Sequence, residues 1–317
     1  MQVIKAVSDL DKVQAAIEEE VLGVQHSDSV ENLNKRAILY YRQGRYQEAE
    51  PLMKEMLTIW RETLGEQHPN TATGLNNLAQ LYEKLGRYEE AEPLCREALT
   101  IKRKLLAEQP LDIVASLNNL AALYETLRRY EEAESLYQEA LAIRHKFLGE
   151  HHPDIATSLN NLATLYYNQG RYEEAEPLMK RSLVIWQRVL GERHPSVAIG
   201  LNNLAELYYS QGRYEEAEYL MRETLLIWQR VLGEQHPSVA IGLNNLAELY
   251  HSQGRYEEAE PLYKEALAIL IRVLGEGHPR TQTVLSDYLE FLSDKGGTDE
   301  KTMESTPLQW VRSLLKS

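Results

Sequence analysis

Pairs of neighbouring asparagines recur along the sequence at a spacing of 42 residues. They are Asn76-Asn77, Asn118-Asn119, Asn160-Asn161, Asn202-Asn203 and Asn244-Asn245, with Asn34-Lys35 at the corresponding place nearer the N-terminus. A carboxamide both donates and accepts hydrogen bonds, so a row of these side chains could hold an extended peptide without reading its sequence. The same amides could instead bond one repeat to the next. We expect at least one member of each pair to face a ligand and the other to join neighbouring repeats.

Two further positions of the repeat differ from copy to copy and are candidates for ligand specificity. Four residues after the first asparagine the chain has Ile38, Gln80, Ala122, Thr164, Glu206 and Glu248. Seven residues after it the chain has Tyr41, Glu83, Glu125, Tyr167, Tyr209 and His251. Variation on a constant framework is what a recognition surface would show. Solvent-exposed positions also drift freely, and both interpretations stay open.

Charge divides these candidate positions into two halves. Lys35, Arg42 and Lys84 bring positive charge to the N-terminal half, whereas Glu206 and Glu248 make the C-terminal half acidic. An acidic ligand is therefore expected to fit only the first half.

The histidines and glutamates do not form a pattern typical of catalysis. Five histidines each precede a proline, one per repeat: His68, His152, His194, His236 and His278. Stacked repeats would hold them much farther apart than the ~2 Å metal–ligand distances of zinc, so we interpret them as structural. The repeated Glu-Glu-Ala-Glu runs open helices, where acidic side chains favour the helix dipole and stay solvated. No nucleophile motif or phosphate loop is present, and we expect no enzyme activity, no metal and no cofactor.

The tripeptide Gly-Arg-Tyr marks a repeat that must position these residues. It begins at Gly44, Gly86, Gly170, Gly212 and Gly254, and Arg128 takes the place of glycine in the one remaining copy. Six full repeats therefore span about 28–275. In the fifth, apolar residues at helical spacing predict one helix over 196–210 and a second over about 215–232. Trp60, Trp186 and Trp228 share one register on the apolar side of the second helix, which predicts that they are core residues.

Helix ends in the fifth repeat can also be assigned. Pro195 suits the first helical position, and Ser196 is expected to accept a hydrogen bond in the first turn. Gly212 follows the first helix where a positive φ is usual. Arg128 holds the equivalent place in the third repeat, and a left-handed conformation there would be strained by ~1 kcal/mol.

The two ends of the array are expected to carry half-units. Residues 5–21 are predicted to be an isolated second helix and residues 280–293 an isolated first helix, so that the solenoid extends over 1–294. A polar linker is expected at 295–305, followed by an amphipathic helix at 306–317 that contains Trp310. That helix could cap the last repeat, or it could occupy the protein's own binding surface and inhibit it.

Composition excludes several classes of protein. The 317 residues have a formal net charge of -14, which argues against binding to nucleic-acid backbones or anionic membranes. The single cysteine, Cys95, excludes a disulfide framework. No apolar stretch is long enough to span a membrane and no signal-peptide core is present, so we expect a cytoplasmic protein.

The motifs together resemble those of a known family. Alanines at two close-packing positions (Ala205 and Ala217 in the fifth repeat) are typical of tetratricopeptide repeats. The 42-residue form with Leu-Asn-Asn-Leu-Ala, Gly-Arg-Tyr-Glu-Glu-Ala-Glu-Pro-Leu and Leu-Gly-Glu-x-His-Pro is similar to the repeats of kinesin light chains and their prokaryotic relatives, over about 5–293. The resemblance implies an all-α, right-handed superhelical solenoid whose first helices line a concave, peptide-binding groove.

Two features distinguish the chain from that family's best-known members. The heptad coiled coil by which kinesin light chains join the motor has no counterpart, so we do not expect a motor subunit. The Lys/Asn constellation that clamps a partner's C-terminal carboxylate in some tetratricopeptide domains is also missing.

The sequence therefore predicts a non-enzymatic scaffold that binds a protein or peptide in the concave groove. The alternative is a structural module that self-assembles through its end or convex surfaces. In either case we expect a monomer or weak homo-oligomer that binds neither nucleic acid nor membrane.

Overall fold

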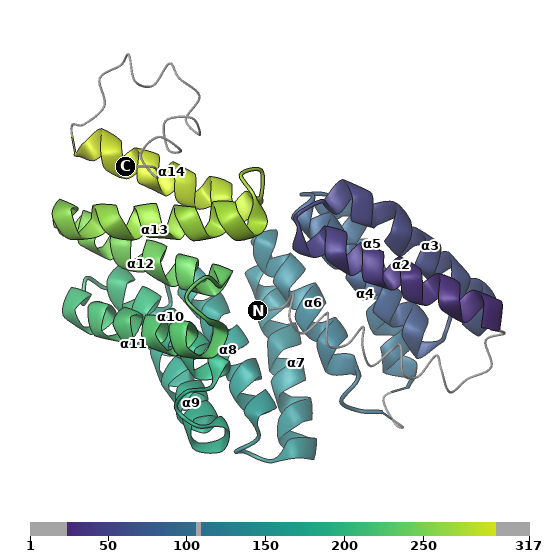
Figure 1. The fold of residues 1–317 in the computed structure, drawn as a ribbon. Coiled ribbons are helices and arrows are strands. Elements are labelled where there is room, and N and C mark those ends of the chain that lie inside the picture. Colours follow the sequence, from purple (N-terminus) through teal and green to yellow (C-terminus); the bar gives the residue numbers. More distant parts are fainter. Residues whose placement is uncertain (1–23, 106–108, 296–317) are drawn as a thin grey trace. The chain divides into compact units, whose positions relative to one another are not determined.

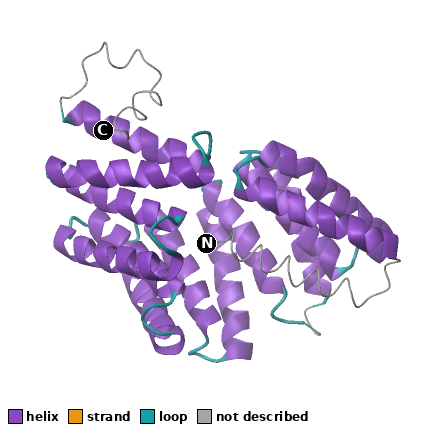
Figure 2. Ribbon diagram, in the orientation of Figure 1, coloured by secondary structure: helices purple, strands orange, loops and turns teal. Residues whose placement is uncertain are grey.

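The computed structural model describes residues 24–105 and 109–295, and every regular element within these ranges is an α-helix (Figures 1 and 2). The all-α fold class is thereby confirmed. The helices predicted at 5–21 and 306–317 lie outside the described residues, as does all but the first residue of the linker predicted at 295–305. Contacts divide the chain into two compact units, one ending at Glu150 and the other beginning at His151.

The first unit contains three helix pairs. The helices are α2 (Val24–Arg42), α3 (Tyr46–Leu64), α4 (Pro69–Lys84), α5 (Tyr88–Lys104), α6 (Ile113–Thr126) and α7 (Tyr130–Leu148). Each even-numbered helix packs against the next odd-numbered one, and α3 and α5 also pack against the following repeat. We call the even-numbered helices first helices and the odd-numbered ones second helices.

The second unit contains three more pairs and one additional first helix. The helices are α8 (Pro153–Asn168), α9 (Tyr172–Leu190), α10 (Pro195–Ser210), α11 (Tyr214–Leu232), α12 (Pro237–Ser252), α13 (Tyr256–Leu274) and α14 (Pro279–Asp294). First helices contact their neighbours directly, α8 with α10 and α12 with α14. Side chains one repeat apart can therefore meet.

Small residues allow the helices of a pair to approach closely. Ala205 of α10 and Ala217 of α11 are completely buried. The predicted core tryptophans are confirmed, since Trp60 and Trp186 are at most 2% exposed. Glycine faces each tryptophan ring: a Cβ added at Gly74 would lie 2.8 Å from the Trp60 ring.

The final helix, α14, has a polar outer side. Gln282 and Ser286 are exposed, whereas Ala240 and Asn244, the residues 42 positions earlier in α12, are buried. Polar residues at positions that a further repeat would cover are the mark of a terminal capping element. α14, the last helix among the described residues, therefore has the polar outer positions of a capping element.

The histidines cap the first helices, which corrects the role predicted for Ser196. The Nδ1 atom of His194 accepts a hydrogen bond from the Ser196 backbone N–H at 3.1 Å, so histidine rather than serine is the capping side chain. The same 3.1 Å bond recurs at His68, His152, His236 and His278. An imidazole that accepts through Nδ1 satisfies one of the N–H groups left without partners at a helix start.

The turns between paired helices have the predicted left-handed residue. Gly212 has φ 73°, and Arg213 N–H then donates to the Tyr208 carbonyl at 2.8 Å. Arg128 keeps this conformation with φ 58° and is the one non-glycine residue with positive φ within 24–105 and 109–295. The strain expected at Arg128 is therefore present.

Candidate functional site

The predicted site residues lie on one set of positions along the first helices. We call this set the first-helix face: the two asparagine positions and the positions four and seven residues after the first asparagine. The positions four and seven residues on are partly exposed in all six repeats. The first asparagine is buried in five of them: Asn34, Asn76, Asn160, Asn202 and Asn244. The second member is partly exposed at Asn77, Asn119, Asn161, Asn203 and Asn245.

The asparagines of the second unit form a hydrogen-bonded ladder between repeats. Nδ2 of Asn203 donates to Oδ1 of Asn160 at 3.0 Å, and Nδ2 of Asn245 donates to Oδ1 of Asn202 at 3.0 Å. The second member of one pair thus bonds the first member of the pair before it. Both members take part in the seam, and the second one also keeps some exposed surface.

Glu206 joins this ladder and receives two amide donors. Asn202 Nδ2 donates to its Oε1 at 2.7 Å, and Asn245 Nδ2 donates to the same atom at 3.2 Å. Burial raises the pKa of Glu206, while the two amides act in the opposite direction. The amide groups of Asn202 and Asn245 therefore supply the Glu206 carboxylate with hydrogen bonds that water would otherwise provide.

Glu248 lies one repeat further on and has different neighbours. Nδ2 of Asn244 donates to Glu248 Oε1 at 2.8 Å and to Asp287 Oδ2 at 2.9 Å. Asp287 occupies the place that asparagine holds in the five preceding repeats. Burial, followed by the charge of Asp287, raises the pKa of Glu248 to about 8. Two carboxyl groups thus share one amide donor.

Aromatic side chains border the ladder at the position seven residues after the first asparagine. Tyr209 packs against Tyr214 with ring centroids 5.8 Å apart, and His251 packs against Tyr256 at 6.0 Å. His251 Nε2 also lies 3.1 Å from Asp294 Oδ2 on the next first helix. In α8, the Tyr167 hydroxyl lies 2.8 Å from Ser210 Oγ, and the Thr164 hydroxyl donates to its own helix.

The first unit lacks a continuous ladder. Asn76 Nδ2 donates to Ser116 Oγ at 2.9 Å, but the Oδ1 atoms of Asn34, Asn76 and Asn118 are buried and accept no hydrogen bond from the described residues. Gln80 is partly exposed and Lys84 is exposed.

Of the two acids of this face in the first unit, Glu125 accepts a hydrogen bond from the Tyr137 hydroxyl at 3.2 Å, whereas Glu83 is poorly solvated. Oε1 of Glu83 is buried without a hydrogen-bond partner in the part of the chain that the structure describes. Burial raises the pKa of Glu83 to about 7, and the nearby charge of Lys84 offsets only part of that effect. Lys35 forms an exposed ion pair with Glu31, within its own helix.

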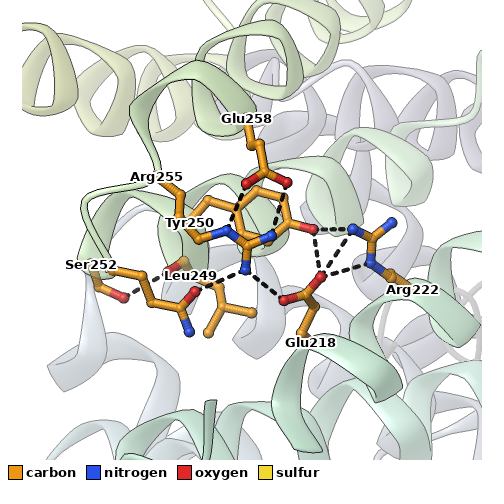
Figure 3. Close-up of polar contacts among 8 residues, drawn as sticks. Glu218, Arg222, Leu249, Tyr250, Ser252, Arg255 and Glu258 are labelled. Carbon is orange, nitrogen blue, oxygen red and sulfur yellow. Dashed lines mark hydrogen bonds and ion pairs between the residues drawn. The ribbon is translucent and has the colours of Figure 1, made fainter. Parts of the chain in front are cut away.

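An arginine clamp joins the repeats, and sequence reasoning did not identify it. Arg255 donates from Nε and Nη2 to Glu258 at 2.7 and 2.8 Å and from Nη1 to Glu218 of the preceding repeat at 2.7 Å (Figure 3). Its guanidinium lies over the Tyr250 ring, 4.0 Å from the centroid, and the Tyr250 hydroxyl donates to Glu218. The sequence does contain a signal for this clamp, because the arginine of Gly-Arg-Tyr recurs at a fixed distance of 37 residues after a glutamate.

The same clamp recurs elsewhere in the array. The residues that form the clamp recur in other repeats, where Arg87–Glu50, Arg129–Glu92 and Arg213–Glu176 are the equivalent ion pairs. Because Glu176 and its counterparts hold the arginine, these glutamates are structural residues and are not free for chemistry.

The described residues offer no obvious metal or membrane site. No three or more histidine, cysteine, aspartate or glutamate side chains among them come together as a metal site would require. None of the described helices combines the length and the apolar character needed to cross a bilayer.

Comparisons with known proteins agree with the repeat architecture. The family model described as tetratricopeptide repeat matches residues 28–104, 112–183, 154–225, 196–272 and 238–290. No curated protein matches the chain.

Several solved structures are similar. BtubC (BKLC) from P. vanneervenii is 27% identical with a TM-score of 0.56, and the match covers 75% of this chain and 92% of that one. A putative kinesin light chain from Podosopora anserina, with nearly identical TPR-like repeats, is 29% identical with a TM-score of 0.52, over 65% and 97% of the two chains. A Rap protein complexed with Competence and Sporulation Factor has a TM-score of 0.61 at 14% identity, over 99% and 92%, which reflects the fold alone.

The family match covers most of the chain, and similar repeats occur in a putative kinesin light chain. The paired helices, the left-handed turn residues and the alanine close contacts account for that match physically. The chain belongs to the tetratricopeptide repeat family, and its repeats are similar to those of a putative kinesin light chain.

Proposed function

We propose that the protein is a non-enzymatic scaffold that binds a partner peptide, or an extended segment of another protein, along the first-helix face. Tetratricopeptide repeats commonly mediate protein–protein interaction, which is the general function. The location of the binding surface is the specific part of the proposal.

The observation that carries the proposal is the partial exposure of the positions four and seven residues after the first asparagine. All twelve are open to solvent in part, and their side chains differ between repeats, as at Gln80, Thr164 and Glu206. The second asparagines beside them are also partly exposed, and Asn203 and Asn245 are fixed by the ladder. Polar groups held in place before a ligand arrives lose less conformational entropy on binding, which favours affinity.

A peptide array tests this proposal. Asn160→Ala, Asn202→Ala and Asn244→Ala are combined in one variant, and its binding to the array is compared with that of the unmodified protein. We expect loss of bound peptides, because the ladder that fixes the face is removed. Unchanged binding by the variant would reject the first-helix face as the binding surface.

Two controls separate binding from folding. A matched variant carries Glu173→Gln, Glu215→Gln and Glu257→Gln, three exposed changes in second helices of the same repeats, and should bind as before. Tyr209→Ala trims the face without removing a ladder bond, so it should weaken binding while circular dichroism and thermal unfolding stay near normal.

The alternative function, self-assembly through the outer surface, has one observation in its favour. Exposed apolar residues recur on the second helices of the second unit: Val184, Val189, Leu226, Val231 and Val273 are each 44–51% exposed. The corresponding residues of α3 and α5 are polar at Thr58 and Thr100, so the fold does not require an apolar residue there. Light scattering across a concentration series tests this alternative, and a constant monomer mass would reject it.

A further inference from the structure

The end of the asparagine ladder differs from its middle in a way that leaves a hydrogen-bond donor missing. Glu206 receives amide N–H groups from Asn202 and from Asn245 of the next repeat. At Glu248 the next repeat supplies Asp287 in place of asparagine, and a carboxylate cannot donate. The amide donor that the repeat normally provides is therefore absent, and a proton retained on Glu248 takes its place between the two carboxyl groups.

Buried polar atoms at the same place also lack partners. Asn244 is 6% exposed, and its Nδ2 bonds both Glu248 and Asp287, yet its Oδ1 accepts no hydrogen bond from the described residues. The hydroxyl of Tyr263 on α13 is completely buried and is also unpaired within that part of the chain. Buried polar atoms normally have partners, and the unpaired amide oxygen here differs from those of Asn34, Asn76 and Asn118 because its side chain lies beside two carboxyl groups.

The charge at this point is negative and comes from several helices. Glu206 of α10 and Asp287 of α14 both raise the pKa of Glu248 on α12. Glu248, Asp287, Tyr209 and Glu290 likewise raise the pKa of Tyr263, after the effect of burial. Negative groups that crowd together in a partly buried place favour a positively charged ligand.

We propose that Glu248, Asp287 and Asn244 form a binding site for a cationic side chain, lysine or arginine, of a bound partner segment. The proposal rests on the first-helix face being the binding surface. An ammonium or guanidinium group carries only donors, and the site offers the carboxyl groups of Asp287 and Glu248 as acceptors, with Glu248 releasing its proton to solvent as the cation binds. Glu248 and Asp287 are both partly exposed, so the ligand can approach from solvent.

The site implies where along the second unit a basic residue of the ligand would bind. Glu206 is already paired with two amides and needs no external donor, whereas the Glu248–Asp287 pair does. A basic residue of the partner is therefore expected at the α12–α14 end. This differs from the N-terminal half, where exposed Lys35 and Lys84 favour acidic ligands.

Asp287→Asn is the decisive variant. It restores the amide that the other repeats have at this place, so it should fold at least as well as the natural chain while removing the cation site. Glu290→Gln is the matched control, because it removes one negative charge from the same helix and the same cluster while leaving Glu248, Asp287 and the amide that they share unchanged.

The measurement is a peptide array in which every position is occupied in turn by lysine, arginine, norleucine or glutamate. We expect the natural chain and Glu290→Gln to prefer lysine or arginine at one position of the bound peptides. Asp287→Asn should lose that preference, with roughly tenfold weaker binding of the basic peptides and unchanged binding of the norleucine ones. Equal losses in Asp287→Asn and Glu290→Gln would overturn the site, since they would reflect net charge alone.

A second measurement separates this site from the proposed function as a whole. If no peptide binds any of the three proteins, the scaffold proposal fails, and n-butylammonium chloride then tests the site directly. Carboxyl ¹³C resonances of Glu248 and Asp287 should shift and saturate in the natural chain and not in Asp287→Asn. Equal shifts with sodium chloride at the same ionic strength would show that screening, rather than a cation site, is responsible.

Discussion

The two compact units are built from one repeat, yet they satisfy their buried polar groups differently. In the unit beginning at His151, Asn160 and Asn202 each accept an amide from the following repeat. In the unit ending at Glu150, the Oδ1 atoms of Asn34, Asn76 and Asn118 have no partner among the described residues. The repeats of the second unit are close copies of one another, and copies preserve both donor and acceptor. The first unit keeps the corresponding asparagines, including Asn77 and Asn119, so its missing ladder bonds are a difference of geometry rather than of residue type.

The acids show the same contrast. Glu206 is held by two amides, whereas Glu83 has a buried oxygen with no partner in the described part of the chain. The lesson is that a polar contact of the repeat depends on the packing of two repeats at once, so the same residues can pair in one unit and not in the other.

The largest effect is expected where a glycine meets a tryptophan. A Cβ at Gly74 would lie 2.8 Å from the Trp60 ring in the first unit, but a Cβ at Gly200 would lie 3.2 Å from the Trp186 ring in the second. Gly74→Ala should therefore destabilise by about 2 kcal/mol, and Gly200→Ala by less. Urea unfolding gives the total change, and hydrogen exchange assigns it to a unit. An equal cost at both sites would contradict this difference in packing.

A pH profile tests the two buried acids. Because the pKa of Glu83 is raised to about 7 and that of Glu248 to about 8, the folded state favours their protonated forms. Their contribution to stability is fully present below pH 4.5 and is lost as the pH rises through those values. Glu83→Gln and Glu248→Gln should each flatten this loss and stabilise by roughly 1–2 kcal/mol at pH 8.5.

The exposed Glu290→Gln serves as the control for both acids and should leave the profile unchanged. The profile is measured by thermal or urea unfolding between pH 5 and pH 9, a range chosen to bracket the two raised pKa values. If the profile of Glu248→Gln follows that of the natural chain, Glu248 is not the group that titrates.

Replacing Arg128 at its left-handed turn is expected to change stability by a smaller amount, and to raise it rather than lower it. Arg128→Gly should stabilise the first unit by about 1 kcal/mol, because glycine adopts φ 58° without steric strain. Gly212→Arg is the reverse change in the second unit, at φ 73°, and should destabilise by a similar amount. Both are measured as shifts in the urea midpoint, and a destabilising Arg128→Gly would show that the arginine side chain outweighs the strain.

The smallest effect is expected from removal of residues 296–317. The outer side of α14 is already polar at Gln282 and Ser286, so the second unit needs no additional cap. We expect the free energy of unfolding to change by less than about 0.5 kcal/mol. Tighter peptide binding with unchanged stability would favour the inhibitory role for 306–317, whereas a clear loss of thermal stability would favour the capping role.

Much of the fold followed from the sequence, because its signals are local. The proline at the start of each first helix, the glycine at each left-handed turn and the helical spacing of apolar residues all act within a few residues. Gly212 and Trp186 were assigned correctly for this reason. Ser196 was assigned wrongly, because the helix begins at Pro195 and the side chain that caps it is that of the preceding residue, His194.

Less of the candidate site could be predicted. The sequence placed Asn202, Asn203 and Glu206 on first helices, but it left open which asparagine is buried. It also gave no role to Asp287 or to the arginine of Gly-Arg-Tyr. Each of these residues acts through a partner in another repeat, and periodicity alone does not tell which side chains meet across a seam.

The sequence by itself determined the repeat, the helices and the turns that separate them, because these depend on contacts between near neighbours in the chain. The tertiary structure decided how the polar residues pair: Asn203 with Asn160, and Asn244 with Asp287, each across 43 residues. It also decided that Glu248 faces a second acid rather than an amide. Such pairings exist only when adjacent first helices pack side by side, and at that step a row of similar asparagines becomes a ladder with a distinct end.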